Sequence, residues 1–190
     1  MGRVRHGKVW FGMVGGGDET PYFRELCSAM SLLAEHPRSI FMGQSVLYEG
    51  TAMHRTLKHI DPAKRLELPV FEDCQLGMAT GMSLNGDLPI CAYPRINFLL
   101  CAMSQLCLHL DKIPQYSAYK PKVIIRTAVA TDYPLNPGIQ HLGLYFRQIA
   151  GMLDVVRVVP LYTPEQIMLE YKQALDFDGS TLIVEMLGNY

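Results

Sequence analysis

The sequence predicts an α/β fold: a doubly wound, mainly parallel β-sheet with helices on both faces. Short apolar runs alternate with helical patterns from Thr20 to the end of the chain, which is the order expected of βαβ units. The runs are apolar at successive positions, as strands are when both faces of their sheet are covered. No internal repeat or low-complexity segment breaks the alternation, which argues against a solenoid or a propeller.

Six short apolar runs are the predicted strands. They lie at 39–43, 65–68, 89–93, 122–127, 155–159 and 181–185. Ligands of open α/β sheets bind beyond the carboxyl ends of the strands. A site is therefore expected on the loops that lead from these runs into helices.

The first predicted helix begins with Thr20 as its N-cap and Pro21 at its first position, a favoured start for a helix. Its apolar stripe consists of Phe23, Leu26, Cys27, Met30, Leu33 and Ala34. Further helices are predicted near 48–60, 72–84, 96–112, 140–151 and 163–176. The helix that begins at Ile96 is apolar over more than one stripe, which predicts burial on two sides.

Length and charge indicate one ordinary globular domain. The chain has 190 residues, of which 49% are hydrophobic, enough for a single sizeable core. We expect 19–190 to form that domain and 1–18 to be a flexible tail. The 17 Lys and Arg residues balance 18 Asp and Glu residues, so the composition indicates no nucleic-acid surface.

The cysteines and the apolar segments indicate a cytoplasmic protein. Five cysteines lie mostly in apolar surroundings without CxxC spacing, which is typical of reduced core thiols rather than of disulfides or zinc ligands. The apolar run at 9–14 is shorter than a signal-peptide core of ~7–15 residues because Gly12 interrupts it. The most apolar helix candidate also falls short of the ~18 residues that a membrane span needs.

Two adjacent carboxylates, Glu72 and Asp73, open the predicted helix of the stretch LPVFEDCQLGMATGMSLNG. They could serve only as first-turn acids, which complement the helix dipole by roughly 0.3–1 kcal/mol. A carboxylate at the rim of the sheet could instead share or pass a proton if a partner surface buries it. Local pattern alone leaves both interpretations open.

Other chemical motifs are weaker. The six histidines have no metal-ligand spacing to one another or to the cysteines, and no G-x-S-x-G elbow is present. The glycines at 15–17 follow no convincing strand and lack a phosphate-binding pattern. The residues taken one by one thus predict no metal ligand and leave the function open.

Several segments taken in order resemble the pyrimidine-binding domain of thiamine diphosphate enzymes. They read TPYFRELCSAMSLLAEHPRSIFMGQSV, RLELPVFEDCQLGMATGMSLNGDLPICAYPRINFLLCAMSQL, KPKVIIRTA and VVRVVPLYTPEQ. The resemblance spans roughly 20–187 and is closest to the beta subunit of the decarboxylating component of 2-oxoacid (pyruvate) dehydrogenases, with transketolases as wider relatives. It implies the fold predicted above.

The resemblance assigns roles to three residues. In PVFE, Glu72 falls on the glutamate that hydrogen-bonds the ring nitrogen of the cofactor's aminopyrimidine, which favours the tautomer that takes the thiazolium proton. Asp73 then remains a helix-start acid. Phe98 matches an aromatic position near the pyrimidine, with core packing as the alternative. His141 falls close to a histidine on the substrate side, with an ordinary loop histidine as the alternative.

The chain also departs from the family pattern. Gln44 replaces a carboxylate after the first strand, and the loop at 127–137 is rich in Thr, Pro and Asn where the family loop is rich in glycine. Neither the carboxyl-terminal transketolase domain nor the G-D-G…N pattern for the diphosphate metal is present in the sequence. The resemblance therefore implies that thiamine diphosphate is shared with a diphosphate-binding, alpha-like chain, and that Mg²⁺ lies on that chain.

Three functions follow from the resemblance. The leading expectation is a beta-type subunit that decarboxylates a 2-oxoacid with acyl transfer, inactive alone and prone to self-association. A split transketolase-type subunit that acts on a ketose, or a carboligase subunit, is the enzymatic alternative. A non-catalytic or regulatory remnant is the third, favoured by Gln44 and opposed by Glu72.

Overall fold

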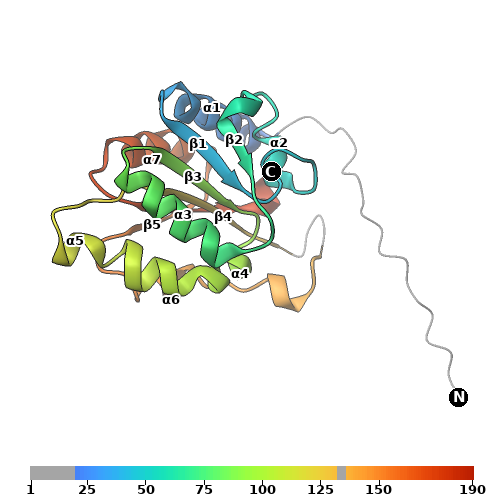
Figure 1. The fold of residues 1–190 in the computed structure, drawn as a ribbon. Helices are drawn as coiled ribbons and strands as arrows, with labels where there is room; N and C mark the ends of the chain where they lie inside the picture. The colour runs from blue at the N-terminus through green and yellow to red at the C-terminus, as the bar shows by residue number, and fades with distance from the viewer. Residues whose placement is uncertain (1–19, 132–135) are drawn as a thin grey trace, which may run out of the picture.

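A six-stranded, wholly parallel sheet forms the centre of the protein. The computed structural model describes residues 20–131 and 136–190, and its strand order is β2-β1-β3-β4-β6-β5 (Figure 1). The strands are β1 (Ser39–Gly43), β2 (Arg65–Glu67), β3 (Leu88–Tyr93), β4 (Ile124–Val129), β5 (Arg157–Leu161) and β6 (Thr181–Met186). All six predicted runs are thus confirmed as strands. The predicted tail at 1–18 lies outside the described residues.

Three long helices match their predicted positions, whereas the shorter ones differ. They are α1 (Pro21–Glu35), α3 (Glu72–Leu84) and α7 (Pro164–Asp176). The predictions for 48–60 and 140–151 were too long, because only α2 (Ala52–Arg55) and α6 (Phe146–Ala150) are α-helical there. In the first stretch Leu57 and Ile60 are buried from a turn that follows α2, whereas in the second only Phe146 and Ile149 of α6 are buried. Apolar spacing alone therefore overstated both helices.

The predicted helix at 96–112 is not one regular α-helix. It begins as α4 (Ile96–Leu99), tightens to a 3₁₀ turn and then widens to a π-helix at Gln105–Leu110. The expectation that it is buried on two sides was also wrong for this chain, because Leu108 is 63% exposed and Leu100 is 40% exposed. The extra apolar width of this segment therefore faces outward.

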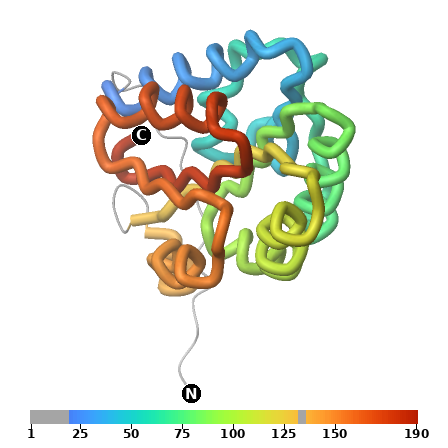
Figure 2. The backbone as a smooth tube through the Cα atoms, turned by 90° about the vertical axis from the view of Figure 1, so that its left-hand side faces the viewer, coloured from blue at the N-terminus to red at the C-terminus, as the bar shows by residue number. Residues whose placement is uncertain are grey.

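Helices cover both faces of the sheet (Figures 1 and 2). One layer contains α1, α2 and α7, and the other contains α3, α4, α5 (Ile113–Tyr116) and α6. Along β1, Phe41 packs in the first layer and the next residue, Met42, packs in the second. Successive side chains point to opposite faces, which explains why the strands are apolar at consecutive positions.

The end of β1 approaches β3 so closely that only glycine fits. Gly43 has φ +143°, and a Cβ atom there would lie 2.4 Å from the Ala92 carbonyl oxygen. The amide nitrogen of Gln75, at 3.0 Å from the same point, closes the space from α3. Gln44, the residue after β1, therefore lies next to the end of β3.

A buried ion pair joins β4 to β6 inside the layer of α1, α2 and α7. Arg126 donates from Nε and Nη2 to the two carboxylate oxygens of Glu185, at 2.8 and 3.0 Å. Its Nη1 donates to Thr56 beyond α2 at 3.1 Å, and the hydroxyls of Tyr171 and Tyr190 donate to Glu185. Burial and the nearby carboxylate raise the pKa of Tyr171 well above its ordinary value, so this tyrosine remains a donor.

The structure contradicts part of the sequence prediction for the cysteines. Cys91 and Cys107 are buried as core thiols, but Cys74 and Cys101 are exposed, so the core assignment was wrong for these two. Both lie on the outer side of the layer that contains α3 and the segment after α4.

Within the described ranges, no helix is long and apolar enough to cross a membrane.

We predict that Gly43→Ala destabilises the protein by about 1–3 kcal/mol, because the new Cβ meets a backbone oxygen in a strained conformation. Gly81→Ala is the matched control, since a Cβ there meets nothing within 4 Å and alanine favours the helix. Urea unfolding measures both free energies. Equal stability of the Gly43 variant and the wild type would contradict the close approach.

We predict that Arg126→Met costs about 3–5 kcal/mol of unfolding free energy, because the Glu185 carboxylate then stays buried without its counter-ion. Arg157→Met is the control, since the Arg157–Glu170 pair is partly exposed and such pairs contribute about 0–1 kcal/mol. Thermal and urea unfolding provide the comparison. Similar losses in the two variants would show that the buried pair is not a special contributor.

Candidate functional site

The four residues that the sequence singled out follow the carboxyl ends of four neighbouring strands. Gln44 follows β1, Glu72 follows β2, Phe98 follows β3 and His141 follows β4. The chain leaves β1 toward the layer of α2 but leaves β3 toward the opposite layer of α4 (Figure 1). Adjacent strands that diverge in this way mark the switch point at which ligands of open α/β sheets bind, and Gln44 follows the β1 strand of this point.

Glu72 is the first residue of α3 and is held there by the ends of β1 and β3. The Tyr93 hydroxyl donates to the Glu72 backbone carbonyl at 3.0 Å. One turn later, Gln75 Nε2 donates to the carbonyls of Ala92 and Met42, at 3.2 and 3.4 Å. The first turn of α3 is therefore fixed to the sheet by buried side-chain hydrogen bonds rather than by an N-cap side chain, which Phe71 does not provide.

Glu72 is 9% exposed as a residue, and one polar side chain among the described residues contacts its carboxylate. Gln44 Nε2 donates to Oε1 at 3.3 Å. Among the described residues, no hydrogen bond reaches Oε2. One carboxyl oxygen is thus held by this chain, and the other is left to accept or donate a further hydrogen bond.

The loop that carries Gln44 is anchored by a second glutamate. Glu67, at the end of β2, accepts the backbone N–H groups of Ser45, Val46 and Leu47 at 2.6, 2.9 and 2.7 Å. Ser45 has φ +54°, an uncommon conformation for a residue with a side chain. The carboxylate gathers these consecutive N–H groups and so maintains the sharp turn.

Asp73 has different partners from Glu72. Ser104 Oγ donates to Oδ1 at 2.7 Å, and Gln105 Nε2 donates to Oδ2 at 3.2 Å. The hydrogen bonds from Ser104 and Gln105 lower the pKa of the Asp73 carboxyl. Asp73 therefore joins α3 to the segment after α4, a link that helix-start composition did not predict.

Phe98 and His141 lie together, as a second pair at the same edge. Their ring centroids are 5.8 Å apart, with the planes tilted by 56°. His141 Nδ1 lies 3.1 Å from Asn97 Oδ1; because an amide oxygen only accepts, this hydrogen bond requires a proton on Nδ1. The described contacts join Phe98 to His141 and Gln44 to Glu72, but they do not join one pair to the other.

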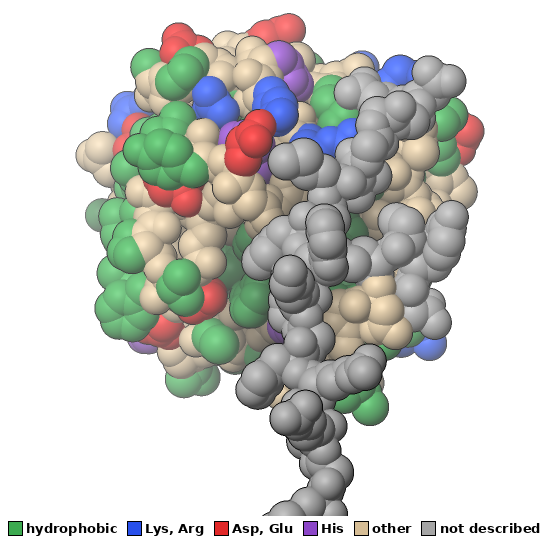
Figure 3. Space-filling model, turned by 90° about the vertical axis from the view of Figure 1, so that its right-hand side faces the viewer, with side chains coloured by type: hydrophobic (Ala, Val, Ile, Leu, Met, Phe, Trp, Pro, Cys, Tyr) green, Lys and Arg blue, Asp and Glu red, His purple; other side chains and the backbone are tan. Residues whose placement is uncertain are grey.

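Exposed apolar side chains surround the start of α3. Val70 is 76% exposed and Phe71 is 62% exposed, immediately before Glu72. Figure 3 shows hydrophobic side chains gathered along one side of the face that lies to the right in Figure 1. We call five exposed hydrophobic residues of α3, its preceding loop and the segment after α4 the apolar strip: Val70, Phe71, Met78, Leu100 and Leu108.

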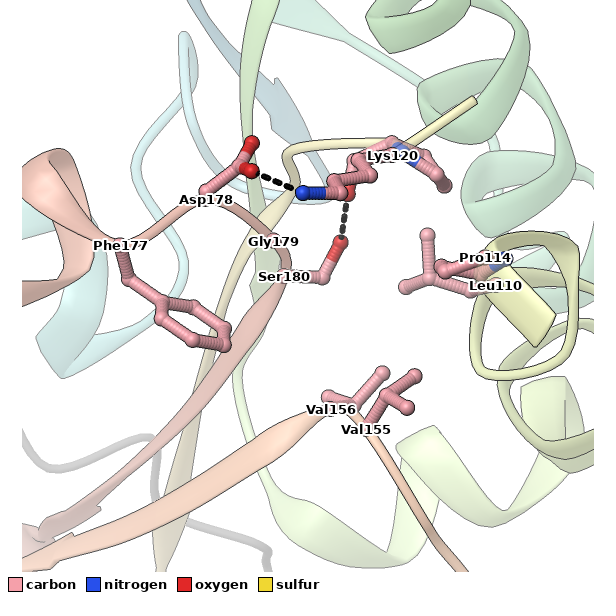
Figure 4. A pocket seen from close by; sticks show the side chains of 10 residues that line it. Leu110, Pro114, Lys120, Val155, Val156, Phe177, Asp178, Gly179 and Ser180 are labelled. Atoms are coloured by element: carbon pink, nitrogen blue, oxygen red, sulfur yellow. Dashed lines mark hydrogen bonds and ion pairs between the residues drawn. The ribbon is translucent and has the colours of Figure 1, made fainter. Parts of the chain in front are cut away.

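A separate hollow of about 310 Å³ lies at the amino ends of β4, β5 and β6 (Figure 4). Its walls are largely apolar, and its rim carries the Lys120–Asp178 ion pair. The Ser180 hydroxyl in its wall already donates to the Pro121 carbonyl at 2.7 Å. The hollow thus lies at the opposite edge from Glu72 and offers no set of converging polar groups.

Four supporting residues were not assigned to the site from sequence: Gln44 as a partner of Glu72, Glu67, Gln75 and Tyr93. Gln75 could have been found, since it lies three residues after Glu72 and shares its helix face. Tyr93 and Glu67 depend on strand order and register, which spacing along the chain does not reveal. Gln44 was noticed only as a departure from the family pattern.

Comparison with known proteins supports the fold. No family model and no curated protein matches the chain. A solved structure described as "Split gene transketolase, inactive beta4 tetramer" matches with a TM-score of 0.59 at 18% sequence identity. The match covers 86% of this chain and 49% of that chain, so this chain spans about half the length of that neighbour. The transketolase-like fold implied by the resemblance is therefore confirmed.

We predict that stability falls as the pH drops below about 6.5, because of His54. This residue is 4% exposed and its Nδ1 has no partner among the described residues. Burial lowers its pKa below the ordinary value of 6.5, although the Ser45 backbone and Glu49 act in the opposite direction. The unfolded chain then binds the proton more readily, so acid favours unfolding.

Urea unfolding between pH 5 and 8 measures this dependence. His54→Gln should flatten the curve, whereas His109→Gln, at an exposed position, should leave its slope unchanged. A slope that persists in the His54 variant would assign the effect to other groups.

Proposed function

We propose that this protein is the pyrimidine-binding, beta-type subunit of a heteromeric thiamine diphosphate enzyme. The observation that carries the proposal is Glu72, nine-tenths buried as a residue at the carboxyl edge, with one carboxyl oxygen held and one available. The position in PVFE and the transketolase-like fold support the same role. The activity, substrate and partners of the whole enzyme are part of the proposal.

The donor set fits an aminopyrimidine ring. Glu72 Oε2 would hold the ring nitrogen, the half-buried Phe98 ring would cover an apolar face, and His141 would lie on the substrate side. When bound, thiamine diphosphate supplies the carbon nucleophile that adds to a ketone or 2-oxoacid carbonyl. This chain would contribute orientation, exclusion of water and a carboxyl oxygen of Glu72 directed at the ring nitrogen.

Glu72, rather than Asp73, has a carboxyl oxygen available to the cofactor. Both oxygens of Asp73 accept hydrogen bonds from Ser104 and Gln105, which favours its charged form. Glu72 accepts only at Oε1 from the described residues, which leaves Oε2 available. The two adjacent acids therefore serve different purposes: Asp73 fastens two helices, and Glu72 addresses the cofactor.

A second chain would complete the site. The phosphates need a divalent metal and its oxygen ligands, and the diphosphate-binding pattern is not in this sequence. The apolar strip beside Glu72 is suited to burial against protein, since exposed apolar patches mark interaction surfaces. An alpha-like chain that brings Mg²⁺ and covers this strip would exclude water from the carboxyl. Self-association is also proposed, and the structural neighbour is described as a beta4 tetramer.

Two reaction classes remain in the proposal. Decarboxylation of a 2-oxoacid with acyl transfer follows from the sequence resemblance. Ketol transfer is the enzymatic alternative, and a solved structure of similar fold is described as a split gene transketolase. A non-catalytic subunit is the alternative outside catalysis, and the same neighbour is described as inactive. The Glu72 carboxyl supports a catalytic role, because one oxygen is held by Gln44 and the other has no hydrogen bond from the described residues.

We predict that the chain binds thiamine diphosphate with Mg²⁺ only when it is assembled with a diphosphate-binding chain. Co-purification followed by calorimetric titration measures this. In the assembled enzyme, Glu72→Gln should reduce turnover by roughly 10²–10⁴-fold, as the loss of an acid–base group does. Glu170→Gln is the matched control, since Glu170 pairs with Arg157 on the other layer.

Turnover assays with a 2-oxoacid and with a ketose donor distinguish the reaction classes. An assembled complex that binds cofactor without turning over either class of substrate would favour the non-catalytic alternative. Failure of the complex to bind cofactor, or wild-type activity in the Glu72 variant, would refute the proposed function.

A further inference from the structure

We propose that Gln44 is the positioning residue for Glu72, and that Glu67 sets Gln44 in place. This inference rests on the proposed function, which it deepens by naming the residues that orient the carboxyl. The sequence resemblance put Gln44 in doubt because it replaces a carboxylate. The structure gives the amide a different task from the one that a carboxylate would have.

The direct contact is the hydrogen bond from Gln44 Nε2 to Glu72 Oε1 at 3.3 Å. It fixes one carboxyl oxygen and thereby the plane of the group, so that Oε2 is presented in one direction. The backbone of Glu72 is held separately by Tyr93. The carboxyl is thus oriented by a contact from β1, while its main chain is anchored to β3.

Gln44 can orient Glu72 only if its own backbone is rigid. The residue lies between Gly43, at φ +143°, and Ser45, at φ +54°, two conformations that few residues adopt. The Glu67 carboxylate accepts the N–H groups of Ser45, Val46 and Leu47, which maintains the turn. Glu67 therefore holds the loop backbone, the loop places Gln44, and Gln44 orients the Glu72 carboxyl.

An amide suits a carboxyl that changes its protonation state. It donates from Nε2 when the carboxyl is ionised and, after a half-turn of the amide, accepts at Oε1 when the carboxyl carries a proton. A carboxylate at position 44 would repel ionised Glu72 and would compete for the same proton. Gln44 therefore keeps Glu72 oriented in both states and leaves the proton to Glu72 alone.

The chain by itself provides the first test. Side-chain amide signals of Gln44 in a ¹H–¹⁵N NMR spectrum should shift in Glu72→Gln and in Glu67→Gln. They should be unchanged in Glu170→Gln, and the amide signals of Gln173, exposed on α7, should not respond to Glu72→Gln. A Gln44 signal that ignores both Glu72 and Glu67 overturns the inference, whether or not the chain belongs to an enzyme.

The assembled enzyme provides the second test. Gln44→Leu should reduce turnover about tenfold, as the loss of one hydrogen bond to a charged group does, and Gln173→Leu should have no effect. The double variant Gln44→Leu/Glu72→Gln should be no slower than Glu72→Gln alone, because Gln44 acts through Glu72. Additive losses would overturn the positioning role.

The pH dependence separates positioning from simple support of the fold. Gln44→Glu should add a second ionisation to the pH–rate profile, because two acids then share one proton, whereas Gln44→Leu should lower the rate without adding one. An unchanged profile in Gln44→Glu would contradict the inference. Correct NMR responses without cofactor binding in the assembled complex would instead refute the proposed function and leave the contact established.

Discussion

The structure depends on the register in which β1 pairs with its two parallel neighbours. Gly43, the last residue of β1, stands level with Glu67 of β2 on one side and with Ala92 of β3 on the other. This alignment lets Glu67 reach the loop after β1 and lets Gln75 reach the Ala92 carbonyl. A slip by one residue would turn every side chain of β1 to the opposite face, and both contacts would be lost.

In the other half of the sheet, the pairing of β4 with β6 is fixed by a buried ion pair rather than by a glycine that packs against a neighbouring strand. Arg126 and Glu185 are fully buried and face the layer of α1 and α7, where an apolar pair would have been expected. Their hydrogen bonds to Thr56, Tyr171 and Tyr190 connect two strands, a turn, a helix and the last residue of the chain. Such a network is stable only when every member has a partner, so it ties these segments to one arrangement.

How far the sequence could predict this molecule depends on the range of each interaction. The strands and the long helices were predictable because burial on two faces leaves a local apolar pattern, as in SIFMG and in the stripe of α1. The positions of Gln44, Glu67 and Tyr93 around Glu72 were not, because they depend on which strands are adjacent. Arg126 was hidden for a related reason: its partner lies 59 residues away, and a charge inside a predicted strand carries no sign of its counter-ion. The irregular helix after Ile96 shows a further limit, since apolar spacing does not distinguish α from π geometry.

The proposed function centres on Glu72. Glu72 lies at the carboxyl edge of the sheet, where hydrogen bonds from Tyr93 and Gln75 hold the first turn of its helix. Gln44 holds one of its carboxyl oxygens. We propose that a partner chain covers the apolar strip beside it. The central claim is that a second chain completes this site around an aminopyrimidine. The most direct test is the structure of the chain assembled with its partner, Mg²⁺ and thiamine diphosphate, in which a Glu72 carboxyl oxygen should lie roughly 2.6–3.2 Å from the pyrimidine ring nitrogen. A pyrimidine held elsewhere, with no hydrogen bond between its ring nitrogen and Glu72, would contradict the account.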